Sequence, residues 1–112
     1  MRRAELTIQQ IGLTESEVIL AVSGELDMST IDTLAGQVDT HLQRSVNSLT
    51  LDLSDLAFMD STGLRLLIEL NDRAEREPWR LRLVGPRQHA ASRVLRITGA
   101  DLALPFEREN GH

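Results

Sequence analysis

The stretch LDLSDLAFMDSTGL, residues 51–64, joins two sequence patterns. Its first leucines alternate with polar residues, which is typical of a half-buried strand, whereas the apolar residues that follow recur at helical spacing. Between the two patterns lie Asp60, Ser61 and Thr62, whose side-chain oxygens can accept hydrogen bonds from the first free N–H groups of a helix. The stretch therefore predicts a strand that delivers a carboxylate and two hydroxyls to the N-terminus of a helix.

The same two patterns extend over the rest of the chain. Alternating apolar residues predict strands at residues 4–11, 17–23, 49–53, 81–84 and 102–106. Helical spacing predicts helices at residues 30–43 and 88–98. Between them, a further helix is predicted to begin at Asp60 and to continue until Pro78 stops it. With 112 residues there is room for one domain, so we expect residues 1–112 to form a single α/β domain, a sheet covered by helices, with a polar tail at 107–112 that has nothing to pack against.

Each predicted helix has one apolar face. Ser29 is the expected N-cap of the first helix, His41 is expected on its polar side, and Gly99 is the expected end of the last helix. The side chains expected to be buried are Ile31, Leu34, Val38 and Leu42 in the first helix, Leu64, Leu67, Ile68 and Ala74 in the second, and Ala91, Val94, Leu95 and Ile97 in the third.

The composition argues against several classes of partner. The net charge of -5 opposes binding to nucleic acid or to an anionic lipid surface, both of which favour a basic face. No apolar run reaches membrane length, and Met1–Arg3 are not followed by the apolar region of a secretory signal. We therefore expect a cytoplasmic protein with no nucleic-acid partner and no direct membrane insertion.

The sequence also lacks the motifs of metal, nucleotide and redox chemistry. There is no cysteine, the three histidines have no partner at metal-ligand spacing, and without any lysine a P-loop is impossible. Ser61 as a catalytic nucleophile would need a nearby base, and Gly63 does not complete a nucleophile elbow. We therefore expect no metal, no cofactor and no enzymatic activity.

Ser61 has two interpretations from local sequence alone. The positive end of a helix dipole and free N–H groups favour an anion, so a phosphate ester on Ser61, with a charge of about -1.5 to -2, could be tolerated there. Alternatively, Asp60, Ser61 and Thr62 are simply a capping cluster, and Gly63 allows close packing. Both interpretations stay open at this point.

Three motifs, in order, resemble the STAS domain family, and specifically the bacterial anti-sigma factor antagonists. Residues 60–64, Asp-Ser-Thr-Gly-Leu, resemble the D-S-[ST]-G signature that follows a strand ending in L-x-L-S. Gly24-Glu25-Leu26-Asp27 is similar to the family's G-E-L-D after its second strand, and residues 95–99 resemble its L-x-x-T-G helix end. The resemblance implies a mixed sheet of four to five strands covered by about three to four helices.

The resemblance also implies a function in regulating transcription. Ser61 aligns with the phosphoacceptor, and the candidate partner-binding residues are Asp27, Asp60, Thr62 and Leu64. The implied partners are an anti-sigma factor that is also a serine kinase, and a metal-dependent serine phosphatase. In such a cycle the unphosphorylated antagonist binds the anti-sigma factor and frees the sigma factor, and phosphorylation ends the binding. The alternative is a STAS subunit that docks on a membrane transport assembly, such as an ABC-type lipid transporter.

Overall fold

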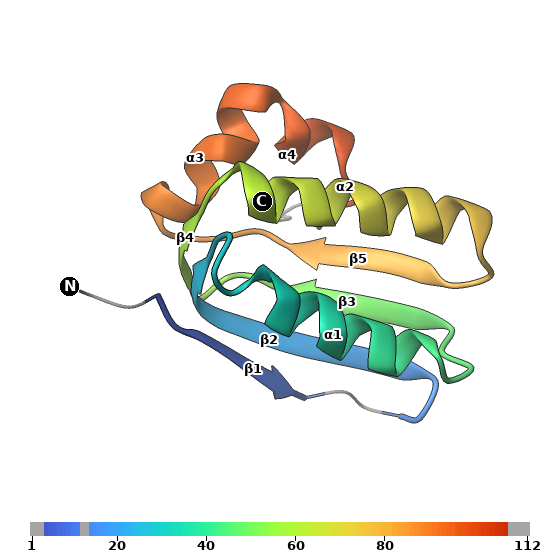
Figure 1. Ribbon diagram of the computed structural model, residues 1–112. Coiled ribbons are helices and arrows are strands. Elements are labelled where there is room, and N and C mark those ends of the chain that lie inside the picture. The colour runs from blue at the N-terminus through green and yellow to red at the C-terminus, as the bar shows by residue number, and fades with distance from the viewer. Residues whose placement is uncertain (1–3, 12–13, 108–112) are drawn as a thin grey trace, which may run out of the picture.

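The computed structural model describes residues 4–11 and 14–107. Within these ranges the chain forms five strands and four helices. In chain order they are β1 (Leu6–Gln10), β2 (Glu17–Leu26), α1 (Ile31–Leu42), β3 (Ser48–Asp52), β4 (Leu56–Met59), α2 (Ser61–Arg76), β5 (Arg80–Val84), α3 (His89–Thr98) and α4 (Ala100–Ala103). Figure 1 shows α1 and α2 running along the same side of the sheet, with α3 near β4 and α4 next to α3. The expected mixed α/β architecture is confirmed.

The long strand β2 organises the sheet. It pairs with β1 in the antiparallel sense and with β3 and then β4 in the parallel sense, while β5 extends the sheet beyond β3. The register shifts between Gly24 and Glu25, where β2 passes from one parallel neighbour to the next. Gly24 has a φ of 99°, and a Cβ there would run into the carbonyl oxygen of Glu5. Only glycine fits this position without strain.

The core consists mostly of leucine. Alternate side chains of β2, β3 and β5 point to the helix side of the sheet, and there they meet the apolar faces of α1 and α2. In the described part of the chain, no helix combines the length and the apolar character that crossing a bilayer requires. The largest fully buried side chains are Leu20, Leu26, Leu34, Leu49, Leu51, Leu53, Leu56, Leu67, Leu70, Leu83, Val22 and Val38.

The predicted set of strands needs two corrections. The structure has a strand at Leu56–Met59, a stretch where no strand was predicted. The strand expected at 102–106 is instead the short helix α4 followed by a single bridge between Leu83 and Phe106. Gly99, with a φ of 78°, ends α3 and reverses the chain, and its carbonyl then accepts hydrogen bonds from the backbone N–H groups of Leu102 and Ala103 in α4.

Several details of the helices also differ from expectation. The N-cap of α1 is Thr30 and not Ser29. His41, expected on the polar side, is buried near the end of α1, where it borders the same hollow as Gln10 of β1 and Val18 of β2. Ile68 and Ile97 are 44% and 69% exposed, because the buried stripes of α2 and α3 are centred on other residues. Those stripes include Leu66, Leu67 and Leu70 in α2, and Ala91 and Leu95 in α3. The part of the predicted polar tail at 108–112 lies outside the described residues.

Candidate functional site

The site lies where β2 and β4 end side by side. Leu26 pairs with Met59 in the parallel register, and the backbone N–H of Asp60 donates to the carbonyl of Leu26 at 3.3 Å. The next residues, Asp27 and Asp60, therefore leave the same edge of the sheet together. Carboxyl ends of parallel strands are where α/β folds usually place their functional loops.

Asp60 is the N-cap of α2. Its Oδ1 accepts hydrogen bonds from the backbone N–H groups of Thr62 at 2.9 Å and Gly63 at 3.4 Å. Of the two interpretations left open by the sequence, the first relied on free N–H groups, and the Asp60 carboxylate already occupies those of Thr62 and Gly63. The capping alternative is therefore correct for Asp60, and it fixes the direction in which α2 leaves the sheet.

Ser61 is the first residue of α2, and its side chain is exposed. The described residues supply no hydrogen-bond partner for its hydroxyl, so the oxygen faces solvent. Thr62 is half-buried, and Leu64 belongs to the core with 8% of its surface exposed. Of the three, Ser61 is the most accessible to another protein, and Leu64 offers a partner very little surface.

Gly63 packs α2 against the ends of both strands. A Cβ at this position would lie 2.6 Å from Cγ of Met59 and 3.0 Å from Cδ2 of Leu26. Such contacts are too short for ordinary packing, so a larger residue would push the start of α2 away from the sheet. Gly63 therefore keeps Ser61 close to the loop that follows β2.

That loop is held by Asp27. Its Oδ1 accepts hydrogen bonds from the backbone N–H of Ser29 at 2.9 Å and from the Ser29 hydroxyl at 2.7 Å. The hydrogen bond from the Ser29 hydroxyl is the main cause that lowers the pKa of the Asp27 carboxyl below its usual value. The buried Thr30 hydroxyl donates to the carbonyl of Glu25 at 2.8 Å and ties the loop to β2. Asp27 is thus ionised and held in a defined position next to Asp60.

Two large apolar side chains close to Asp27 and Asp60 in the sequence are exposed. Met28 is 80% exposed in the loop after β2, and Phe58 is 40% exposed on β4. Neither was singled out from the sequence, although a methionine between Asp27 and Ser29 in a polar loop is an available signal. Exposed apolar side chains among fixed polar groups are typical of protein-binding surfaces.

The site has the character of a surface and not of a ligand cavity. A hollow of about 720 Å³ lies at the opposite end of β2, lined by residues that include Gln10, His41 and Arg44, and none of the candidate site residues lines it. Among the described residues no group of three or more histidine, cysteine, aspartate or glutamate side chains is placed to hold a metal ion.

Comparison with known proteins identifies the family. A family model described as "Mlab, STAS domain" matches residues 10–105. The structure is similar to that of an anti-sigma factor antagonist from Mycobacterium paratuberculosis, with 26% identity over 95% of this chain and 88% of that chain and a TM-score of 0.78.

The fold is also similar to that of the anti-sigma factor antagonist SpoIIAA in two states. For its unphosphorylated form the identity is 23% over 92% of this chain and 90% of that chain, with a TM-score of 0.72. For SpoIIAA described as a Bacillus cell fate determinant in its phosphorylated form, the identity is 23% over 92% and 93% of the two chains, with a TM-score of 0.66. Because the family model spans most of the sequence, the chain belongs to the STAS domain family.

Proposed function

We propose that this protein is an anti-sigma factor antagonist that acts by partner switching. In its unphosphorylated form it binds an anti-sigma factor that is also a serine kinase, and the sigma factor is thereby released. The kinase transfers a phosphoryl group from ATP to the Ser61 hydroxyl, the complex separates, and a metal-dependent serine phosphatase restores the free hydroxyl. The antagonist itself performs no chemistry in this cycle.

The observation that carries the proposal is the exposed Ser61 hydroxyl on a rigidly capped helix start. A kinase must reach the acceptor oxygen, and Ser61 is exposed while its neighbours Gly63 and Leu64 are buried. The Asp60 cap holds the turn in place without using the Ser61 side chain. The similarity to anti-sigma factor antagonists of solved structure supports the same role.

The charges around Ser61 explain how one phosphate can end binding. A phosphate would add a charge of about -1.5 to -2 beside the carboxylates of Asp27 and Asp60. A partner that fits the neutral hydroxyl would then have to bury or oppose a concentrated negative charge. Each 1.4 kcal/mol of lost binding energy weakens affinity about tenfold, so a modest mismatch is sufficient.

The proposal is tested by capturing the partner and following the phosphate. Unmodified protein used as bait in its native host should retain a serine kinase of the anti-sigma type, identified by mass spectrometry. With that kinase and ATP, the protein should gain one phosphate on Ser61. Ser61→Ala should gain none, whereas Thr62→Ala, which removes the neighbouring hydroxyl, should still be phosphorylated.

Two results would contradict the proposal. The first is equal phosphorylation of Ser61→Ala and the parent protein. The second is capture of an ABC-type nucleotide-binding subunit in place of a kinase, which would favour docking on a membrane transport assembly.

A further inference from the structure

A phosphate on Ser61 finds few hydrogen-bond donors in its own turn of helix. The N–H groups of Thr62 and Gly63 donate to Asp60, and that of Leu64 donates to the Asp60 carbonyl at 3.2 Å. The nearest carboxylates along the chain and across the strand ends, Asp60 and Asp27, repel a phosphate. Such a strongly hydrated anion needs a compensating cation. The backbone at the helix start carries no full positive charge, so the cation must come from a side chain.

Arg65 is in the right place to be that cation. It lies four residues after Ser61 on α2, and side chains at this spacing share one face of a helix with Cβ atoms about 5–6 Å apart. Both residues are exposed. Helical side chains lean toward the N-terminus of their helix, and this tendency favours Arg65 rotamers that reach the turn containing Ser61.

The guanidinium of Arg65 is also available. Within the described part of the chain it forms no ion pair and no hydrogen bond, in contrast to Arg73 on the same helix, which pairs with Asp39 at 2.9 Å. Glu69 lies four residues further along α2, on the side away from the usual lean of a helical side chain, and among the described residues no ion pair joins it to Arg65. On a helix, an ion pair is also more favourable when the negative residue lies four positions before the positive one, which is the order of a phosphorylated Ser61 and Arg65.

We propose that Arg65 binds the phosphate of phosphorylated Ser61 within the same chain. Its planar fork can donate two parallel hydrogen bonds to phosphate oxygens, the geometry in which arginine recognises this group best. The contact offsets the repulsion from Asp60 and keeps the start of α2 folded in the modified form. This proposal rests on Ser61 being the phosphorylated residue, and it adds the residue that accommodates the modification.

For the test, phosphoserine is incorporated at position 61 during translation, so that no kinase is required to prepare the modified protein. The second pKa of the phosphate is then measured by ³¹P NMR titration in three proteins: the otherwise unchanged chain, Arg65→Gln, and the control Arg76→Gln, which removes an exposed arginine at the far end of α2. We expect the pKa to be at least about 0.3 units higher in Arg65→Gln than in the other two, because a nearby cation favours the dianion. Arg65→Lys should fall in between.

An identical pKa in Arg65→Gln and in both other proteins would overturn the proposal. Thermal unfolding of unphosphorylated Arg65→Gln should match the parent, which separates loss of the contact from loss of the fold. The test is also independent of the proposed function: failure to find a kinase leaves the ³¹P result valid, and an unchanged pKa leaves the phosphorylation experiment valid.

Discussion

Asp60 and Ser61 are adjacent, yet their side chains have different surroundings. The Asp60 carboxylate is directed back into the first turn of α2, whereas the Ser61 hydroxyl faces outward. Asp60 was expected to contact a partner, and its capping role means that a substitution there can act through stability, through recognition, or through both. The two effects can be separated by the choice of replacement.

Asp60→Ala should lower the free energy of unfolding by about 1 kcal/mol, because it removes the cap of α2. Asp60→Asn keeps an oxygen that can accept the same hydrogen bonds, so its stability should remain within about 0.5 kcal/mol of the parent. Urea unfolding of the three proteins measures both values. If Asp60→Ala is as stable as the parent, the capping hydrogen bonds contribute nothing and this description of the helix start is wrong.

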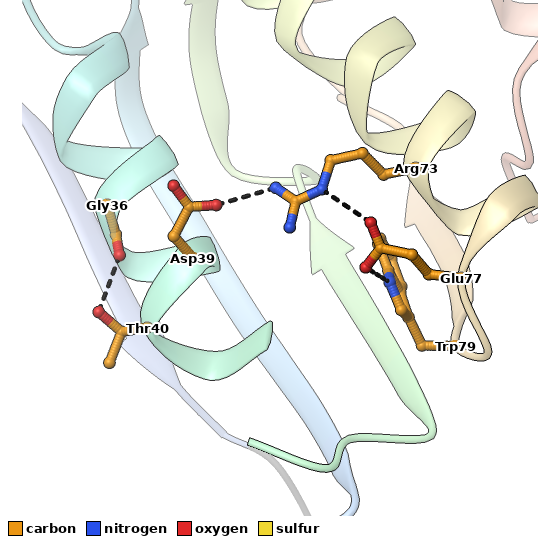
Figure 2. A network of polar contacts seen from close by, with 6 residues as sticks. All are labelled: Gly36, Asp39, Thr40, Arg73, Glu77 and Trp79. Atoms are coloured by element: carbon orange, nitrogen blue, oxygen red, sulfur yellow. Dashed lines mark hydrogen bonds and ion pairs between the residues drawn. The ribbon is translucent and has the colours of Figure 1, made fainter. Parts of the chain in front are cut away.

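At the scale of whole elements, a polar network joins α1 to the C-terminal end of α2. Arg73 donates to Asp39 of α1 at 2.9 Å and lies 3.5 Å from Glu77, while the indole N–H of Trp79 donates to the other oxygen of Glu77 at 3.0 Å. Figure 2 shows Arg73 between the two carboxylates, with Trp79 behind Glu77. The hydrogen bond from Trp79 is the main cause that lowers the pKa of Glu77, and the charge of Arg73 adds to it.

The network predicts a pH dependence of stability. Because the pKa of Glu77 is lower in the folded state, its ionised form stabilises the fold above the unfolded pKa, about 4.3, and this contribution is lost as the pH falls through the folded value. Glu77→Gln cannot titrate, so the difference in unfolding free energy between the parent and this variant should shrink from pH 7 to pH 3. Urea unfolding at several pH values measures it, and a difference that stays constant would contradict the assigned cause.

Sequence patterns predict elements well where the pattern is local and repeated. The alternation in β2, β3 and β5 and the spacing in α1 and α2 are of this kind, and so is the capping signal at Asp60. The strand β4 has only four residues, and it is a strand because it pairs with the later part of β2, a contact that no local pattern encodes. The exposure of Ile68 and Ile97 likewise depends on which neighbours each helix face meets.

For the candidate site, the sequence identifies the residue types but not their directions. Asp60, Ser61 and Thr62 all carry oxygens that could cap a helix, and only the fold decides that Asp60 caps while Ser61 is exposed. The proximity of Asp27 to Asp60 follows from the parallel register of β2 and β4, two segments more than 25 residues apart in the sequence. Phe58 on β4 is placed beside β2 by the same parallel register, whereas Met28 directly follows Asp27 in the sequence.

At the scale of the molecule, Ser61 lies at one end of the sheet and outside the leucine core. A phosphate there touches surface turns, so the fold should be retained while the surface offered to a partner changes. The proposed phosphorylation of Ser61 would make the net charge of -5 more negative, and the added charge would be concentrated beside the ends of β2 and β4. The central claim is therefore that one modification alters docking without altering the fold.

The most direct test is a calorimetric titration of the captured kinase with two forms of the protein, one unmodified and one carrying phosphoserine at position 61. We expect the phosphorylated form to bind more than tenfold more weakly, with the circular dichroism spectra of the two forms superimposable. Equal dissociation constants for the two forms would contradict the account.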